Sequence, residues 1–294
     1  MAAESMKIGA NALIWTTHFS ERDFPILGRL KQAGFDGIEI PVFHPVDVPT
    51  QRIRQALDEN GLECTVCAIL PKPLRPISTE KKVRDETQAH LRACIEVTAE
   101  LGSGLMGGPI YAQIGDLPGR RRNLDEWHWA ADAFENLGPT LDVHRVELAI
   151  EPLNRFETYF LNTIADAASL CDLVQHPRVG ILLDTFHTNI EEKDDAAAVR
   201  TAGKRLFHVH ACENDRGIPG TGHVNFFEIA KALNEIRYQG WITIESFGYT
   251  HPELAAAAAI WRDLAPLPES VAFEGIKHLR RTIASVGHAR LGNS

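Results

Sequence analysis

The stretch Val179–Asn214, VGILLDTFHTNIEEKDDAAAVRTAGKRLFHVHACEN, decides the fold. It begins with a β-rich apolar run, Val179–His187, and ends with a second such run, Leu206–Asn214. Between the two runs, Asp195–Ala202 has the pattern of a helix. The runs are almost continuously apolar, which is typical of strands that are covered on both faces. A strand, a helix and a second strand in succession predict parallel strands joined by a right-handed crossover.

The same alternation runs along the whole chain. The apolar runs predict eight strands, which are Lys7–Trp15, Gly37–Val42, Glu63–Leu70, Gly104–Ile110, Val146–Pro152, Val179–His187, Leu206–Asn214 and Trp241–Phe247. The predicted helices are Asp23–Ala33, Thr50–Asn60, Thr79–Leu101, Leu124–Leu137, Thr163–Val174, Asp195–Ala202, Phe226–Gln239, Pro252–Leu264 and Val271–Ser285. The first three of these helices are followed by Gly34, Gly61 and Gly102, at the position where a left-handed helix end favours glycine.

Eight such units that close on themselves form an α/β barrel, the (β/α)8 or TIM barrel. We expect one domain over residues 1–294, with the helix Val271–Ser285 as a C-terminal addition and residues 1–5 as a disordered N-terminal extension. The alternative is an open doubly wound sheet, which needs fewer strands and a glycine-rich turn after the first. The turn Thr16–Ser20 has no glycine, and Gly220-Thr221-Gly222 does not open a helix, so we expect no nucleotide cofactor.

Composition narrows the possible partners. The 294 residues carry 30 basic and 39 acidic side chains, a net charge of −9, which argues against nucleic-acid binding. The longest apolar run, near Leu254–Trp261, is too short for a membrane span. The N-terminal residues have no apolar signal region and the five cysteines form no disulfide framework. We therefore expect a cytoplasmic protein with reduced thiols and no membrane partner.

Four consecutive strands end in an ionisable residue. These residues are Glu151, Asp184, His210 and Glu245, separated by 33, 26 and 35 residues, about one strand–helix unit each. Because reactive groups of a parallel barrel lie at the C-terminal ends of its strands, we expect the four side chains to meet there. Each residue alone could equally be a salt-bridge or capping residue, but four at matching positions favour a common site.

Three carboxylates in an apolar rim repel one another unless a cation lies between them. Carboxylate oxygens with one imidazole suit Mn²⁺, with Mg²⁺ or Co²⁺ as alternatives, and suit Zn²⁺ less because no thiolate is present. We expect one divalent metal ion per subunit, with Mn²⁺ favoured.

Three more polar residues, Glu157, His187 and Arg216, follow the strand ends, and we expect them in loops on the same face. They could hydrogen-bond the hydroxyl groups of a polar ligand, or they could form loop-ordering ion pairs such as Arg155–Glu157 and Asp215–Arg216. His208 shares the strand parity of His210, and we interpret it as a core histidine one layer below the site. Cys64 and Cys67 have redox spacing but face opposite sides of a strand, so we interpret them as structural thiols, with Cys67 a candidate to line the pocket.

Several segments resemble the ketose 3-epimerase family of the xylose-isomerase-like barrels, whose members act on tagatose, allulose (psicose) and ribulose. The most specific segments are Asn154-Arg155-Phe156-Glu157 and Asp184-Thr185-Phe186-His187. They belong to the longer matching segments Ile150–Glu157 and Leu183–Glu192, and the other segments are Ala33–Asp36, Leu161–Thr163, Glu213–Arg216 and Trp261–Leu264.

The resemblance implies roles for the residues already selected. It implies that Glu151, Asp184, His210 and Glu245 hold one metal ion, that Glu157, His187 and Arg216 bind substrate, and that Trp15, Cys67 and Phe247 line the pocket. It also implies a homodimer or homotetramer. This chain departs from the family at Tyr111, where some members have tryptophan, and at Cys212, where glycine often stands.

The activity implied is metal-dependent epimerisation at carbon 3 of a free ketose, with Glu151 and Glu245 as the acid/base pair on opposite faces of the substrate. The loop Gly248–His251 lacks the glycine-rich basic character of barrel phosphate sites, which favours a free sugar. Alternatives on the same barrel are an aldose–ketose isomerase, a keto-inositol dehydratase and a non-catalytic sugar-binding protein. An abasic-site endonuclease is disfavoured by the negative charge and the single histidine ligand.

Overall fold

The computed structural model of the protein describes residues 6–249 and 252–291 and contains a closed barrel of parallel strands. Each strand pairs with its neighbours in sequence, and the last pairs with the first, so the predicted (β/α)8 topology is confirmed. The predicted extension at residues 1–5 lies outside the described residues. The strands are β1 (Lys7–Asn11), β2 (Gly37–Pro41), β3 (Glu63–Cys67), β4 (Leu105–Gly108), β5 (Glu147–Ile150), β6 (Val179–Asp184), β7 (Leu206–Ala211) and β8 (Trp241–Ile244).

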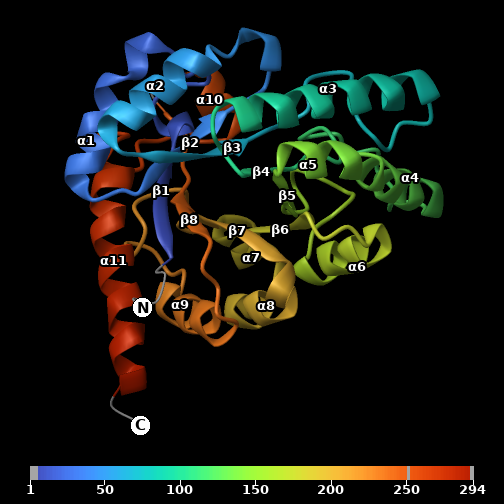
Figure 1. The fold of residues 1–294 in the computed structure, drawn as a ribbon. Coiled ribbons are helices and arrows are strands. Elements are labelled where there is room, and N and C mark those ends of the chain that lie inside the picture. The colour runs from blue at the N-terminus through green and yellow to red at the C-terminus, as the bar shows by residue number, and fades with distance from the viewer. Residues whose placement is uncertain (1–5, 250–251, 292–294) are drawn as a thin grey trace.

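The helices surround this barrel (Figure 1). The α-helices are α1 (Pro25–Ala33), α2 (Thr50–Asn60), α3 (Lys81–Glu100), α4 (Leu124–Glu135), α5 (Gly138–His144), α6 (Ile164–Val174), α7 (Thr185–Glu191), α8 (Asp195–Ala202), α9 (Phe226–Glu235), α10 (Pro252–Ala257) and α11 (Ser270–Leu291). Short 3₁₀ helices are η1 (Ala12–Ile14), η2 (Glu21–Asp23), η3 (Pro45–Asp47) and η4 (Gly203–Arg205).

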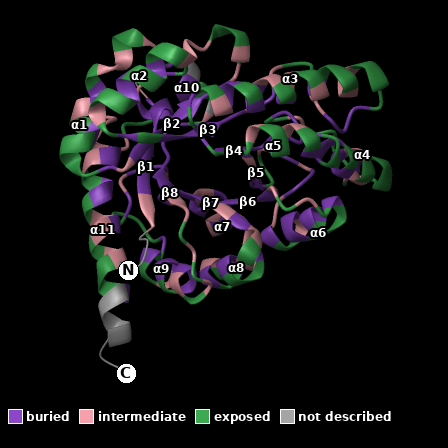
Figure 2. Ribbon diagram, viewed as in Figure 1, coloured by how far each residue is buried: buried purple, intermediate pink, exposed green. Residues whose placement is uncertain are grey.

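The main hydrophobic core lies between the strands and the helices. Figure 2 shows buried residues along the strands and on the inner sides of the helices, with exposed residues on their outer sides. The strands are buried on both faces, which explains why their sequences are apolar runs rather than alternating patterns. A separate apolar cluster of Leu105, Ala149 and Leu182 packs with Phe207 and Trp241 and lies on the barrel strands.

The pairing register of the strands places polar side chains closer to the C-terminal ends of the strands than that apolar cluster. Leu182 of β6 pairs with His208 of β7, and two residues further on Asp184 pairs with His210. Because side chains alternate between the faces of a strand, residues two apart share a face. The apolar layer is therefore followed toward the C-terminal ends by residues that carry ionisable groups.

The strands end earlier than the sequence predicts. For seven of the eight strands, the predicted C-terminal end lies two to four residues beyond the observed end. In the structure, the residues after β1 form the 3₁₀ helix η1 and those after β6 form α7. Asp184 is the reason for the sixth, since its side chain accepts a hydrogen bond from the backbone N–H of Phe186 and caps α7. His187 therefore lies in the first turn of a helix, and its predicted loop position was wrong.

The helix boundaries differ less. Helices α2 and α8 match the prediction at both ends, and Gly34 and Gly61 take the expected left-handed conformation after α1 and α2. Helices α5 and α7 were not predicted, and α10 ends at Ala257, seven residues short of the predicted end at Leu264. The predicted C-terminal helix is present as α11, which extends beyond the predicted Ser285.

Helix α11 lies along α9 and α1 (Figure 1). Arg280 on this helix donates hydrogen bonds to the carbonyl of Gly34 and to Asp36, which follow α1. The C-terminal helix therefore packs where the last strand, β8, pairs with the first, β1, and it links the N-terminal and C-terminal parts of the barrel.

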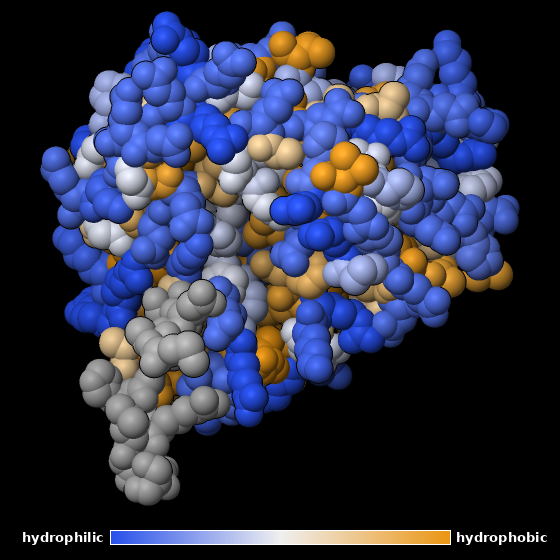
Figure 3. Space-filling view, in the orientation of Figure 1, coloured by the Kyte–Doolittle hydropathy of each residue, from blue (hydrophilic) through white to orange (hydrophobic). Residues whose placement is uncertain are grey.

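Hydrophilic side chains predominate on the face shown in Figure 3, where hydrophobic side chains form small separate groups. Across the described part of the chain, no helix combines the length and the apolar composition that a membrane crossing needs.

Gly108, the last residue of β4, tests the packing of the barrel. Its φ is +141°, and a Cβ atom there would lie 2.1 Å from the carbonyl oxygen of Ala68. We predict that Gly108→Ala lowers the free energy of unfolding by about 2–4 kcal/mol, from backbone strain and overpacking together. Equilibrium unfolding in urea measures it.

Gly115→Ala is the matched control, because Gly115 also has a positive φ of +82° but its Cβ would meet nothing within 4 Å. It should cost only the backbone term of about 1 kcal/mol. Equal losses in the two variants would contradict the predicted clash at Gly108.

Candidate active site

The four strand-end residues come together at the C-terminal mouth of the barrel. Glu151 follows β5, Asp184 ends β6, His210 is the penultimate residue of β7, and Glu245 follows β8. Each offers one ligand atom, and these atoms all lie within 4.8 Å of one another. All four side chains are buried, with exposed fractions of 1–6%. The predicted juxtaposition is therefore present in the structure.

The charges in this group perturb one another. Burial raises the pKa of Glu151, and the charges of Glu245 and Asp184 add to the rise. Burial also opposes ionisation of Glu245, but His210 and Arg216 outweigh it and hold the pKa of that carboxyl below its usual range. The group thus combines an ionised carboxylate with one that resists ionisation, as expected when like charges share a buried site.

The donor atoms fit a divalent metal ion. His210 Nδ1 is buried and forms no hydrogen bond with any described residue, although Glu245 Oε1 lies only 3.2 Å away and Glu151 Oε1 3.8 Å away. An imidazole nitrogen without a hydrogen bond, surrounded by carboxylates, is the arrangement that a metal ion satisfies. Three carboxylates and one imidazole are the ligand types that Mn²⁺, Mg²⁺ and Co²⁺ accept.

Arg216 enters the same group from the loop after β7. Its Nη1 donates to Asp184 Oδ2 at 2.8 Å and to Glu245 Oε2 at 2.7 Å. The guanidinium lies 4.0 Å from the ring centre of Phe186 and 5.1 Å from that of Phe247, so two aromatic rings hold it. The backbone of Arg216 is left-handed, with φ of 65°, and such strain is common at functional sites. Arg216 therefore does not form the alternative ion pair that we considered with Asp215, which binds Arg262 instead.

His187 is fixed by a backbone donor. The N–H of Asn154 donates to His187 Nδ1 at 3.0 Å, so the neutral ring carries its proton on Nε2. Nε2 lies 3.6 Å from Asp184 and 3.8 Å from Glu151. Burial, with the charge of Arg216, lowers the pKa of His187 to about 3. The side chain is thus neutral, and its Nε2 faces the four-residue group and lies 3.3 Å from Nη2 of Arg216.

Glu157 completes the polar wall. Its Oε1 accepts a hydrogen bond of 2.8 Å from the side chain of Asn154. Arg155, the ion-pair partner that we considered for it, binds Glu191 instead. Asn154 therefore orders two of the three predicted substrate-binding residues, one through its backbone and one through its side chain.

A cavity of about 400 Å³ opens over these residues, within the usual range for small-molecule sites. Glu151, Glu157, His187, His210, Arg216 and Glu245 line it. Its apolar wall includes the predicted Cys67 and Phe247, with Leu13, Phe43, Ile69 and Leu254. Trp15 does not line this cavity, and its ring lies 6.3 Å from that of Phe273 on α11.

Tyr111 and Cys212, the two expected departures from the family that the sequence resembles, do not line this cavity. Tyr111 is fully buried; its hydroxyl donates to the carbonyl of Leu161 and accepts from the N–H of Leu153. Cys212 lies beneath the site, with its sulfur 2.9 Å from Arg216 Nη1. Cys64 and Cys67 are free buried thiols, in agreement with the structural interpretation.

Sequence reasoning missed Glu39, Asn11, Asn154 and Glu213. Glu39 carried a signal, because a carboxylate inside the run Gly37–Pro41 interrupts an otherwise apolar strand. Glu213 accepts hydrogen bonds from the N–H groups of Asn214, Gly220 and Val224 and so orders the loop that presents Arg216. Its partners are loop backbone groups, which no side-chain pattern reveals.

The comparisons with known proteins come from sequence and from structure. The family model of the xylose isomerase-like TIM barrel matches residues 27–281. The chain is 36% identical over 282 residues to a probable ketose 3-epimerase of Synechocystis sp., covering 96% of this chain and 98% of that protein. It is 32% identical over 272 residues to a D-psicose 3-epimerase of Agrobacterium fabrum, covering 88% and 91% of the two chains.

Solved structures of 3-epimerases are similar to this chain over almost its whole length. A structure of L-ribulose 3-epimerase superposes with a TM-score of 0.92 at 28% identity, covering 98% of both chains. A D-allulose 3-epimerase from Methylomonas sp., solved in complex with D-allulose, superposes with a TM-score of 0.89 at 29% identity, covering 95% of this chain and 98% of that one.

Thr185 fixes the spacing of two strand ends in the site. Its buried hydroxyl accepts a hydrogen bond from the N–H of Cys212 at 2.8 Å and donates one to the carbonyl of Cys212 at 2.6 Å. One side chain therefore satisfies two backbone groups and holds the residue after Asp184 against the loop that leads to Arg216.

We predict that Thr185→Val, which keeps the shape of the side chain, lowers the free energy of unfolding by about 2–4 kcal/mol, because two buried backbone groups lose their partner. Chemical denaturation measures the loss. Thr201→Val is the control: its exposed hydroxyl on α8 donates to the carbonyl of Ala197, and the change should cost less than about 0.5 kcal/mol. Equal stability of Thr185→Val and wild type would contradict the assigned role.

Proposed function

The chain belongs to the ketose 3-epimerases of the xylose isomerase-like TIM barrel family, and from this premise we propose that it inverts carbon 3 of a free ketose with the help of a divalent metal ion. It is an isomerase that acts on carbohydrates. The observation that carries the proposal is the convergence of Glu151, Asp184, His210 and Glu245 beside a cavity of sugar size.

These four residues are the proposed metal ligands. Mn²⁺ is the proposed ion, with Mg²⁺ or Co²⁺ as substitutes, because the donors are three carboxylates and one imidazole. A divalent cation at this place supplies Lewis acidity, which polarises a carbonyl group and stabilises the charge left by deprotonation.

Glu151 and Glu245 are the proposed acid/base pair. Inversion of carbon 3 requires that its proton leave from one face and that another arrive from the opposite face. The two glutamates follow β5 and β8, which are not neighbours in the barrel, so their carboxyl groups approach the cavity from different sides. One carboxylate takes the carbon 3 proton and leaves an enediolate; the other, protonated, returns a proton to the opposite face.

Glu157, His187 and Arg216 are the proposed substrate contacts. His187 presents an N–H and Arg216 a cation, while Glu157 offers acceptor oxygens, so the three can hold hydroxyl groups on either side of the reacting carbon. Cys67 and Phe247 face the cavity from its apolar wall. Arg216 is the single Lys or Arg in the cavity lining among the described residues, which favours a neutral sugar over a sugar phosphate.

Product analysis tests the proposal. We predict that the protein with Mn²⁺ converts a free ketose such as D-fructose, D-tagatose or D-ribulose into its carbon 3 epimer, seen by sugar chromatography. Treatment with EDTA should abolish the conversion, and added Mn²⁺ should restore it. An aldose product would indicate isomerisation instead, and full activity after verified metal removal would contradict the metal requirement.

Substitution tests whether Glu151 and Glu245 carry the proton. We predict that Glu151→Gln and Glu245→Gln each lower kcat by at least about 10³-fold, because an amide cannot carry the proton. Steady-state kinetics with the metal content measured in parallel gives the result. Glu147→Gln, at the opposite end of β5, is the control and should remain active. Near-full turnover by either site variant would remove that residue from the mechanism.

A further inference from the structure

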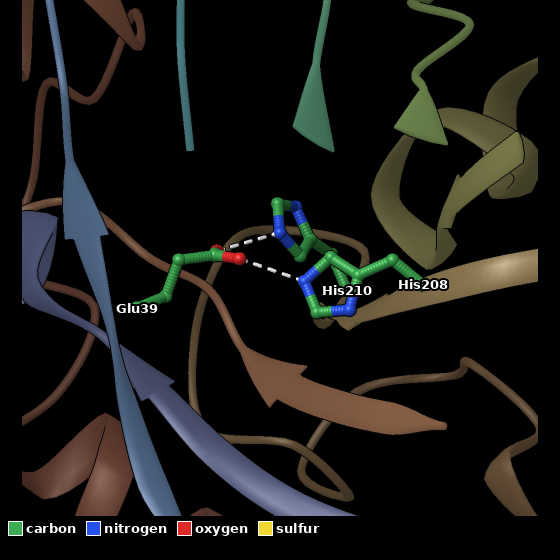
Figure 4. A group of neighbouring side chains, drawn as sticks. All are labelled: Glu39, His208 and His210. Carbon is green, nitrogen blue, oxygen red and sulfur yellow. Dashed lines mark hydrogen bonds and ion pairs between the residues drawn. The ribbon is translucent and has the colours of Figure 1, made fainter. Parts of the chain in front are cut away.

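A fourth buried carboxylate, outside the proposed ligand set, lies directly beneath the proposed metal site. Glu39, in the middle of β2, has a side chain that is 0% exposed. Figure 4 shows its carboxylate pointing across the barrel toward the imidazole rings of His208 and His210 on β7. The reaction proposed above does not use Glu39, yet a buried carboxylate in an apolar strand is costly unless it is fully hydrogen-bonded.

The carboxylate of Glu39 has a donor on every side. Oε1 accepts hydrogen bonds from Thr65 Oγ1 at 2.9 Å and His208 Nε2 at 2.7 Å. Oε2 accepts from Asn11 Nδ2 and His210 Nε2, each at 2.8 Å. Asn11 cannot turn its amide round, because its Oδ1 already accepts the backbone N–H of Leu13. The ionised carboxylate, which only accepts, can bond to all four groups at once.

This arrangement decides which nitrogen of His210 is free. Because Glu39 accepts from Nε2, the neutral ring carries its proton there and has a lone pair on Nδ1. Nδ1 is the atom that faces Glu151 and Glu245 and has no hydrogen-bond partner among the described residues. The ring is thus oriented with Nδ1, the nitrogen that its neutral form leaves unprotonated, toward the other three proposed ligands.

Glu39, His208 and His210 do not themselves form a second metal site. Hydrogen bonds of 2.7 and 2.8 Å join Glu39 to the two rings directly, so protons fill the space that an ion would need. Thr65 and Asn11 occupy the remaining lone-pair directions of the carboxylate. The group supports a site and does not bind the ion.

We propose that Glu39 is a positioning residue for the metal ion: its charged carboxylate holds the proton on Nε2 of His210, which fixes the tautomer and ring orientation and makes Nδ1 a stronger ligand. The proposal rests on the metal site of the proposed function. A carboxylate that accepts the second N–H of a metal-bound histidine also makes the ring a stronger ligand. Asn11 extends the effect, because its Nδ2 lies 3.4 Å from Glu245 Oε1 as well as 2.8 Å from Glu39.

Glu39→Gln tests this with the least change of shape. Asn11 Nδ2 and the N–H of His210 are donors, so the glutamine oxygen should stay with them and its NH₂ group should face Thr65 and His208. The hydrogen bond to His210 then survives without its charge. We expect Co²⁺ to bind Glu39→Gln about 10–100-fold more weakly than wild type, measured by calorimetry. The visible spectrum of the bound Co²⁺ should also change.

His208→Gln is the matched control. His208 bonds to the other oxygen of the same carboxylate, and a glutamine amide can donate to that oxygen in its place. Its Co²⁺ affinity and spectrum should stay close to wild type. A loss as large as that of Glu39→Gln would show that any disturbance of the buried group weakens binding, and would overturn the proposal.

The remaining outcomes are distinct. If folded Glu39→Gln binds Co²⁺ with the affinity and the spectrum of the wild-type protein, the role of Glu39 is overturned and the proposed function stays intact. Failure of the wild-type protein to bind Co²⁺ would overturn the metal site itself. Circular dichroism establishes whether each variant folds. If Glu39→Gln does not fold, Glu39→Asp replaces it, because aspartate keeps the charge but withdraws it from His210. Glu39→Asp should show the same weakening of Co²⁺ binding, and wild-type affinity in this variant would overturn the proposal.

Discussion

The repulsion between carboxylates buried together at the barrel mouth is the constraint on which the rest of the structure depends. Glu151, Asp184 and Glu245 are buried within a few ångströms of one another, and such a group is stable only if positive charge or donors balance it. Arg216 supplies a fixed cation to two of them, and His210 turns a nitrogen toward the same space. The same crowding that is costly for folding would favour binding of the divalent ion that we propose for this site.

Around this group, each functional side chain is held by a partner that does no chemistry itself. Asn154 orders His187 and Glu157, Thr185 ties the end of β6 to the chain after β7, and Glu213 orders the loop of Arg216. Three of these four contacts join a side chain to a backbone N–H group, and two of them link different segments of the barrel mouth. The proton transfers proposed for this protein need groups placed within fractions of an ångström, and such contacts provide that rigidity.

The barrel and its central residues could be predicted because both have a local sequence signal. An apolar run that ends in Glu, Asp or His predicts a buried strand and a reactive end, and four such runs predict a site. The strand boundaries could not be predicted where a polar side chain ends a strand and begins a helix, as Asp184 does when it caps α7. Glu39 and Asn154 were missed because their partners are 169 and 33 residues away, and only the closed barrel brings them together.

The measurement that tests the account most directly is hydrogen exchange at carbon 3. Wild-type protein with Mn²⁺ and a free ketose in D₂O, followed by NMR, should place deuterium at carbon 3 while the epimer appears, because a carboxyl that takes a proton exchanges it with solvent before the reverse step. Deuterium at carbon 1 with an aldose product, or an epimer that forms with no solvent deuterium at carbon 3, would contradict proton transfer at carbon 3 by the two glutamates.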